Sequence, residues 1–230
     1  MSPFKSSLAR TVSKLLGVSK NTDLSIRGDV QTTRQGASFE VSGGTTITSG
    51  IYTYHVFTAD TPSPQSSLVV TAVADSRTAQ ILVVGGGGEG GKDDGGGGGA
   101  GSVVYDPTFS LGATTSYAVT VGATASTPSP PTSGGPIGTL GNNSSFGSNF
   151  LAKGGGSGAK SPIPSSNIGG SGGGGAYPNV PGATGSAPGN IPPSATSYQT
   201  AGGNAGSPGA VEGGGGGGAG GAGGDGSSSG

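Results

Sequence analysis

The sequence has no cysteine, little charge and no long apolar run, and each of these absences excludes a class of protein. Without cysteine no disulfide can staple the fold, and the redox compartment cannot be inferred. Charged residues make up 9% of the chain, which separates it from the highly charged kind of disordered protein. No apolar run approaches the roughly 18 residues that a membrane-spanning helix needs. We therefore expect no membrane span.

Residues that could carry chemistry are also scarce. His55 is the single histidine, and it lies between Tyr54 and Val56 in a stretch rich in strand-forming residues. It has no cysteine to act with and no carboxylate cluster nearby, so we interpret it as a structural histidine. We predict that the protein is not an enzyme, that it needs no cofactor and no metal, and that it has no nucleic-acid partner.

Glycine is abundant, with 54 residues of 230, and 16 prolines accompany it. This composition is typical of low-complexity chains, but the glycines come in blocks and not at every third place, which excludes collagen. The chain is organised around residues 80–91, where an apolar strand over residues 81–84 runs directly into the block at 85–101. A helix there would cost about 1 kcal/mol per glycine, and an ordinary strand would have no side chains to pack. The block is therefore either disordered or a special glycine structure.

Further glycine blocks occur at residues 154–156, 172–175 and 213–218, and they alternate with loops rich in Pro, Ser and Asn. Such runs can form extended threefold helices of the polyproline II type, which pack side by side and pair backbone N–H with C=O. For residues 151–230 we predict packed polyglycine helices with loops at their ends. The loops carry side chains suited to surface contact, namely Tyr177, Asn179, Ile191, Tyr198 and Gln199.

Residues 36–150 are expected to form a small antiparallel β-sandwich that includes the first glycine block. Short runs of strand-forming residues follow one another between turns. The expected strands cover residues 37–41, 51–58, 68–73, 80–84, 103–105 and 117–121. The fold class predicted for the whole chain is thus mainly β.

The N-terminal segment, residues 1–35, differs in character. Ser2 and Pro3 are typical of a helix start, and Gly17 is a natural stop. Between them five apolar residues share one helical face, and residues 1–34 carry a net charge of +4. We predict a helix that docks on another protein, with a membrane-surface helix or an uncleaved targeting segment as the alternatives. The predicted docking residues are Phe4, Leu8, Val12, Leu15 and Leu16.

Residues 86–92 match the first seven positions of a phosphate-binding loop. Asp93 stands where serine or threonine should hold magnesium, and the glycines that follow cannot begin the helix that binds phosphate. We therefore do not expect nucleotide binding.

The order of these motifs resembles the glycine-rich domain of tailed-bacteriophage tail proteins. The strand at 81–84 leads into a glycine run, then come residues 95–104, the strand at 117–123 and the turn at 141–147. The likeness covers roughly residues 50–230. Such domains usually finish on a short apolar strand, whereas this sequence stops at residues 225–230, so we expect either further chain or closure by another subunit.

The resemblance implies a structural component of a phage virion, most readily a tail fibre or tail appendage anchored by its N-terminus. Its implied partners are other virion proteins (a tail adaptor, a portal-associated protein or the capsid), further copies of itself, for example as a trimer, and a glycan or protein of the host surface. The expected location is the virion, on the tail or particle surface. Two alternatives stay open: a capsid-surface decoration protein and a secreted glycine-rich matrix protein.

Overall fold

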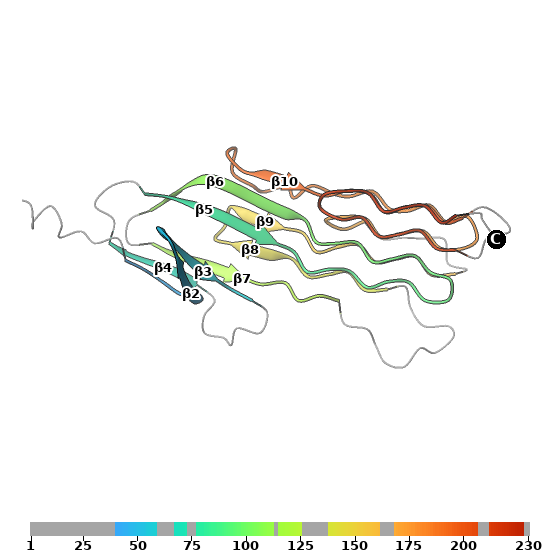
Figure 1. Cartoon of the computed structure of the whole chain (residues 1–230), viewed down its shortest axis with the longest axis horizontal. Coiled ribbons are helices and arrows are strands. Elements are labelled where there is room, and N and C mark those ends of the chain that lie inside the picture. The colour runs from blue at the N-terminus through green and yellow to red at the C-terminus, as the bar shows by residue number, and fades with distance from the viewer. Residues whose placement is uncertain are drawn as a thin grey trace, which may run out of the picture.

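The structure is a computed structural model, and it is elongated, with β-sheets at one end and glycine runs extending from them along the long axis (Figure 1). The part of the chain that it describes is mainly β and contains no helix, in agreement with the predicted fold class in outline. The predicted docking helix at residues 3–16 lies outside this part. The described residues are 40–58, 67–72, 77–112, 115–125, 138–161, 168–206 and 212–227.

Five antiparallel strands form the larger sheet, in the order β1-β4-β7-β8-β9. Strands β4 and β7 were expected from their runs of strand-forming residues. Strands β8 and β9 were not expected, because each is only three residues long. The bounds are β1 Glu40–Ser42, β4 Ser67–Ala72, β7 Ser116–Thr120, β8 Ser144–Phe146 and β9 Phe150–Ala152.

The second sheet has three antiparallel strands in the order β10-β6-β5, with β10 Thr196–Tyr198, β6 Val103–Leu111 and β5 Arg77–Val84. Side chains alternate between the two faces of a strand. In β5 this alternation buries Ile81 and Val83 and leaves Leu82 and Val84 on the outer face. The inner face of this sheet therefore packs against the larger sheet.

The hydrophobic core lies between the two sheets and is built from both. Phe146 and Phe150 pack edge to face at 5.8 Å, and the ring of Phe109 lies 5.0 Å from that of Phe150. Each fully buried aliphatic or aromatic side chain contributes about 1.5–3 kcal/mol. The core is modest in size, and its members are Leu68, Val70, Ile81, Val83, Val104, Leu111, Phe146, Phe150 and Ala152.

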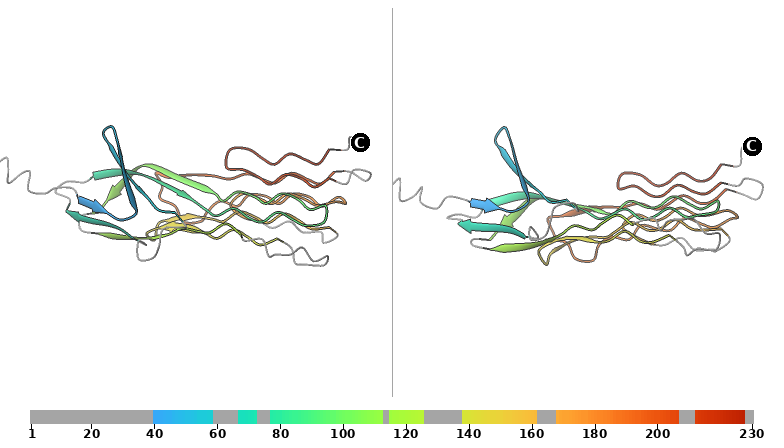
Figure 2. Two further views of the ribbon diagram at one scale, coloured as in Figure 1. Left: turned by 60° about the horizontal axis from the view of Figure 1, so that its bottom comes forward. Right: turned by 90° about the horizontal axis from the view of Figure 1, so that it is seen from below.

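A separate hairpin, β2 (Thr45–Ser49) and β3 (Tyr52–Val56), projects from the sheets (Figure 2). Gly43 and Gly44, with φ of 117° and 62°, form the corner that leads into it. These are left-handed angles that side-chain-bearing residues rarely adopt. The Nδ1 atom of His55 lies 2.9 Å from the carbonyl oxygen of Gly43, so the single histidine holds this corner.

Beyond the sheets, extended glycine-rich runs lie side by side, and we call them the glycine body. The run at 85–91 continues β5, the run at 95–102 leads back into β6, and the run at 153–160 continues β9. Runs far apart in the sequence bond directly to one another. For example, the amide of Gly99 donates to the oxygen of Gly156 at 2.7 Å, which joins the predicted regions 36–150 and 151–230. The glycine-rich runs described are 85–91, 95–102, 153–160, 169–176, 200–206, 212–218 and 221–227, and the segments at 122–125, 139–142 and 180–186 bond to them.

The hydrogen-bond partners of a run repeat every three residues, most clearly in the central run at 95–102. The amides of residues 96, 99 and 102 donate to the oxygens of residues 159, 156 and 153. The amides of residues 97 and 100 donate instead to residues 214 and 217. The oxygens follow the same period, because residues 96, 99 and 102 accept from the first run and residues 97 and 100 accept from the run at 169–176. One run thus bonds to four neighbours, whereas a β-strand bonds to two.

At most glycine positions, the runs approach one another so closely that a side chain is excluded. A Cβ atom placed on Gly88 would meet the backbone of Gly155 and Gly156 well inside 3.0 Å, and one placed on Gly96 would meet Gly174 and Gly175. Real Cβ atoms essentially never show such contacts. The glycine content is therefore a packing requirement of the body, which has backbone hydrogen bonds where an ordinary domain has a hydrophobic core.

Candidate functional site

The turns at the end of the glycine body farthest from the sheets form the first candidate surface, the distal tip. The amide of Tyr177 donates to the oxygen of Asp94 at 3.2 Å, which joins the turn at 177–179 to the turn at 92–94. The ammonium of Lys160 lies 3.7 Å from a carboxylate oxygen of Asp93. The run at 212–218 begins beside Gly95, because a Cβ on Gly213 would collide with the oxygen of Gly95. A bond of 3.0 Å from the amide of Gly206 to the oxygen of Glu212 adds the run at 200–206. Four segments far apart in the sequence therefore meet at this tip.

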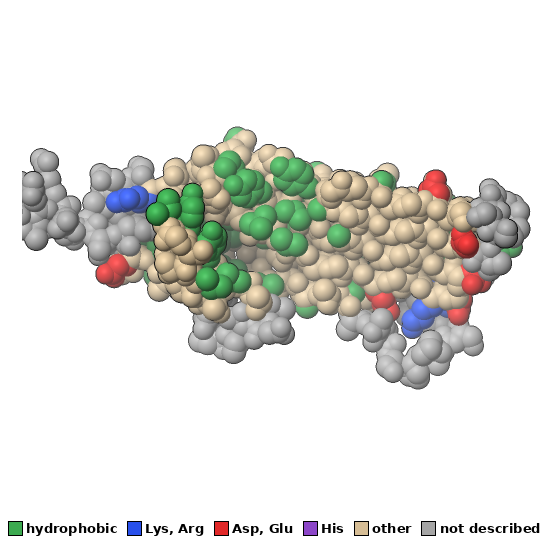
Figure 3. All heavy atoms as spheres, viewed as in Figure 1, with side chains coloured by type: hydrophobic (Ala, Val, Ile, Leu, Met, Phe, Trp, Pro, Cys, Tyr) green, Lys and Arg blue, Asp and Glu red, His purple; other side chains and the backbone are tan. Residues whose placement is uncertain are grey.

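Charge is concentrated at the tip, whereas the surface of the glycine body between the tip and the sheets shows almost none (Figure 3). Lys160 is buried, with 4% of its side chain exposed, while its partner Asp93 is 54% exposed. Asp93 and Asp94 both have positive φ, at 51° and 56°, and both residues are exposed. The described part of the chain holds no group of three or more metal-ligating side chains.

Two of the predicted contact residues lie at the distal tip. Tyr177 is half-buried, and Asn179 is exposed with φ of 59°, a conformation that asparagine tolerates better than most residues. Val180, next in the chain, is buried with Ala159 and Ala176 in a small second apolar cluster. This cluster anchors the turn and leaves Asn179 pointing to solvent.

The other three predicted contact residues lie at the sheet end, so the five do not gather into one surface. Ile191 packs against the main core, and Tyr198 lies in β10 beside Val103, with 47% of its surface exposed. The Oε1 atom of Gln199 is buried and has no hydrogen-bond partner among the residues that the structure describes. The loop around Ile191 is held down by the hydroxyl of Ser194, which donates to Asp106 at 2.7 Å.

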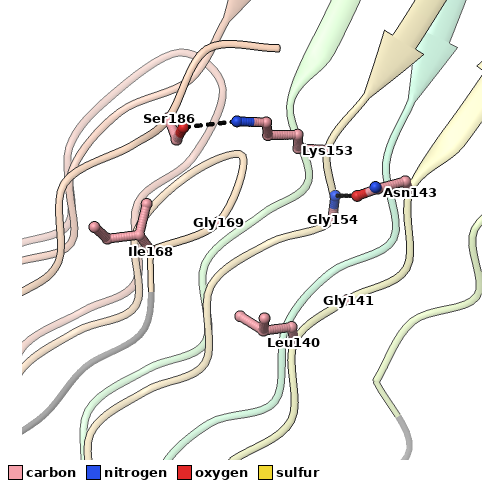
Figure 4. Close-up of a pocket in the computed structure, with 8 residues that line it drawn as sticks. All are labelled: Leu140, Gly141, Asn143, Lys153, Gly154, Ile168, Gly169 and Ser186. Carbon is pink, nitrogen blue, oxygen red and sulfur yellow. Dashed lines mark hydrogen bonds between the residues drawn. The ribbon is translucent and has the colours of Figure 1, made fainter. Parts of the chain in front are cut away.

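A shallow groove of about 240 Å³ lies where the glycine body meets the sheets (Figure 4). Leu140 and Ile168 flank it, and the ammonium of Lys153 donates to the hydroxyl of Ser186 at 2.8 Å. The side-chain oxygen of Asn143 accepts from the amide of Gly154 at 2.9 Å. The volume of the groove is below the roughly 300–1,000 Å³ of most ligand clefts. Its polar groups already serve as bonds between segments of the chain.

The backbone amides of the segment that resembles a phosphate-binding loop are already hydrogen-bonded within the glycine body. The amides of Gly86, Gly88 and Gly91 donate to the oxygens of Asn142, Gly99 and Gly96. The carboxylate of Glu89 is buried and accepts from the amide and hydroxyl of Thr139, both at 3.0 Å. A phosphate bound here would have to compete with these bonds.

Comparison with protein families identifies the architecture. The sequence profile of the glycine-rich domain matches residues 61–230. The chain belongs to the glycine-rich domain family. Comparisons with curated proteins and with solved structures give no match. Within the part described, no helix of this glycine-rich protein is long and apolar enough to cross a membrane.

Sequence reasoning missed one exposed surface of this glycine-rich chain. The hairpin β2–β3 and the outer face of β5 carry large apolar side chains that the described part of the chain does not cover. Residues 51–58 were recognised as strand formers, but exposure cannot be inferred from that pattern. The sequence held one signal: residues 81–84 are all apolar, so both faces of β5 carry apolar side chains there.

Proposed function

We propose that the glycine runs are helices of the polyproline II type and that the body they form is a rigid support. The supporting observation is the three-residue period of the hydrogen bonds, because a polyproline II helix has three residues per turn. A β-strand, with a period of two, would direct successive amides to opposite sides and could not bond to four neighbours in this way.

On this basis we propose that the protein is a structural component of a tailed-phage virion, a tail fibre or tail appendage, that presents surface and performs no catalysis. Two observations support this proposal. One is the order of the sequence motifs, and the other is an elongated glycine body that holds the charged tip at a distance from the sheets. The N-terminal segment would attach the protein to other virion proteins, and the distal tip would face the host surface.

The tip is the part of the body best suited to contact. Its turns combine an exposed asparagine, a half-exposed tyrosine and two exposed aspartates on a support that is built largely of glycine and has few side chains to rearrange. Tyrosine gives a broad contact area at small entropic cost, and asparagine gives adaptable hydrogen bonds. Glycans and cell-surface proteins are partners that such groups can recognise.

Particles of the phage that carries this sequence provide the test. Immunogold labelling with antibody raised against residues 40–227 is expected to mark the tail. Labelling spread over the capsid would favour the decoration protein, and particles without the protein would overturn a virion role.

The contact role is tested separately by replacing residues 177–179 with the corresponding turn of a related phage. Host range or adsorption rate should change while the amount of protein per particle stays the same. Unchanged adsorption at a normal amount of protein would leave the tip with a purely structural role.

A further inference from the structure

The hairpin β2–β3 has one apolar face and one polar face. Ile47 pairs directly with Tyr54, and residues two apart on a strand share a face, so Ile47, Tyr52, Tyr54 and Val56 lie on one side. The opposite side carries threonines and His55, which bonds to the corner of the chain at Gly43. The apolar side is therefore the side that is free to meet a partner.

This apolar side is uncovered in the described part of the chain. Ile47, Tyr52 and Tyr54 are 50%, 55% and 50% exposed, and Ile51 at the turn is 92% exposed. A lone two-stranded hairpin is at best marginally stable in water and usually needs a surface to pack on.

A matching surface exists on the outer face of the three-stranded sheet. Cross-strand partners share a face, so Leu82 lies beside Tyr105, and Val84, Val103 and Tyr198 form the next row. Leu82 is 64% exposed and Val84 50%. Hydrophobic side chains gather over this sheet and over the hairpin on the same face of the molecule (Figure 3), and the hairpin rises from that side (Figure 2).

We propose that this face is a self-association surface, on which the hairpin of one copy packs against the outer face of the β10-β6-β5 sheet of a second copy, and reciprocally. Because hairpin and sheet lie on one side of the molecule, a twofold axis brings each hairpin onto the sheet of the other copy. Besides isoleucine, leucine, valine and tyrosine, the two surfaces carry only uncharged polar side chains, namely Thr45, Ser49, Gln80 and Thr196, so burying them would leave no charged group without a partner.

The area of this face fits a stable dimer. A half-exposed tyrosine or large aliphatic residue leaves on the order of 100 Å² uncovered. The residues of this face that are about half exposed or more therefore leave on the order of 700 Å² per copy, and they are Ile47, Ile51, Tyr52, Tyr54, Leu82, Val84 and Tyr198. A standard protein interface buries about 800 Å² per partner.

Sedimentation equilibrium of the full-length chain tests the proposal. Wild type is expected to be dimeric at micromolar concentration, and Ile51→Asp and Leu82→Asp should each weaken the dimer by about tenfold or more. Ile168→Asp is the matched control, because Ile168 is 58% exposed beside the groove and belongs to neither the hairpin nor the three-stranded sheet. The control should dimerise like wild type. A monomeric wild type would overturn the proposal and leave the face to a different protein, and so would unchanged dimerisation of both aspartate variants.

A second measurement does not depend on how the charged variants fold. The chain has no cysteine, so Ile51→Cys and Leu82→Cys each introduce a single thiol. Under mild oxidation, a mixture of the two variants should form the mixed disulfide dimer faster than either variant forms its own. Faster disulfide formation between two copies of the Ile51→Cys variant would contradict hairpin-on-sheet packing.

Discussion

Gly87 and Gly88 are neighbours in one glycine run, and they should respond oppositely to the same change. A Cβ added at Gly88 would collide with the backbone of the run at 153–160, whereas one added at Gly87 meets nothing within 4 Å. Gly88→Ala must therefore push two runs apart, while Gly87→Ala needs no movement. Comparing the two variants separates the cost of the steric clash from the general effect of replacing glycine by alanine.

The expected magnitudes follow from the bonds between these two runs. Moving them apart endangers the bonds from Gly155 to Gly86 and from Gly158 to Glu89, at 2.8 and 2.9 Å. At about 1 kcal/mol for each bond, with about 1–3 kcal/mol for overpacking, Gly88→Ala should cost about 3–5 kcal/mol. Gly87→Ala should be neutral or stabilise by about 0.4–1 kcal/mol, because alanine reduces the freedom of the unfolded chain.

Urea denaturation followed by far-UV circular dichroism measures both effects. With a slope of about 2 kcal/mol per molar urea, the midpoints of the two variants should differ by about 1.5–3 M. Equal midpoints would refute the close approach of the runs.

Three further predictions concern other parts of the molecule. Phe150→Ala should lower the free energy of unfolding by about 3–5 kcal/mol in the same assay, because Phe150 is 1% exposed in the core; a loss below about 1 kcal/mol would contradict the core assignment. Asn179→Gly should leave stability nearly unchanged, whereas Asn179→Val should cost about 1–2 kcal/mol at φ of 59°, and equal stability of the two would contradict the turn geometry. Leu8→Asp should yield particles that lack the protein while the rest of the particle assembles, as measured by mass spectrometry of purified particles; normal incorporation would exclude the predicted docking helix.

The sequence predicts the strands that carry a local signal. Residues 81–84 and 117–120 were recognised as strands because apolar residues alternate or cluster between breakers. Strands β8 and β9 are too short for such a pattern, and they form because Phe146 and Phe150 bury their rings in the core. Strand β10 lies in a loop-like sequence and is held by distant contacts, through Ile191 and the Ser194–Asp106 bond.

Which residues of the glycine runs pair with one another could not be predicted from the sequence, and the reason differs from that for the short strands. Runs of identical residues carry no register signal, because no side chain distinguishes one alignment from another. Register is fixed instead by the strands from which the runs emerge, such as β5 before Gly85 and β9 before Lys153. The predicted contact residues could be assigned to segments by composition, but only the fold separates Tyr177 and Asn179 at the tip from Ile191 and Tyr198 at the sheets.

The central claim, that a bundle of glycine runs with a three-residue period supports the protein, is tested most directly by scalar couplings across hydrogen bonds in isotope-labelled protein. The amides of residues 96, 99 and 102 should couple to the carbonyl carbons of residues 159, 156 and 153, and those of residues 97 and 100 to residues 214 and 217. Couplings that alternate with a period of two, as in a β-strand, or that are absent throughout residues 95–102, would contradict it.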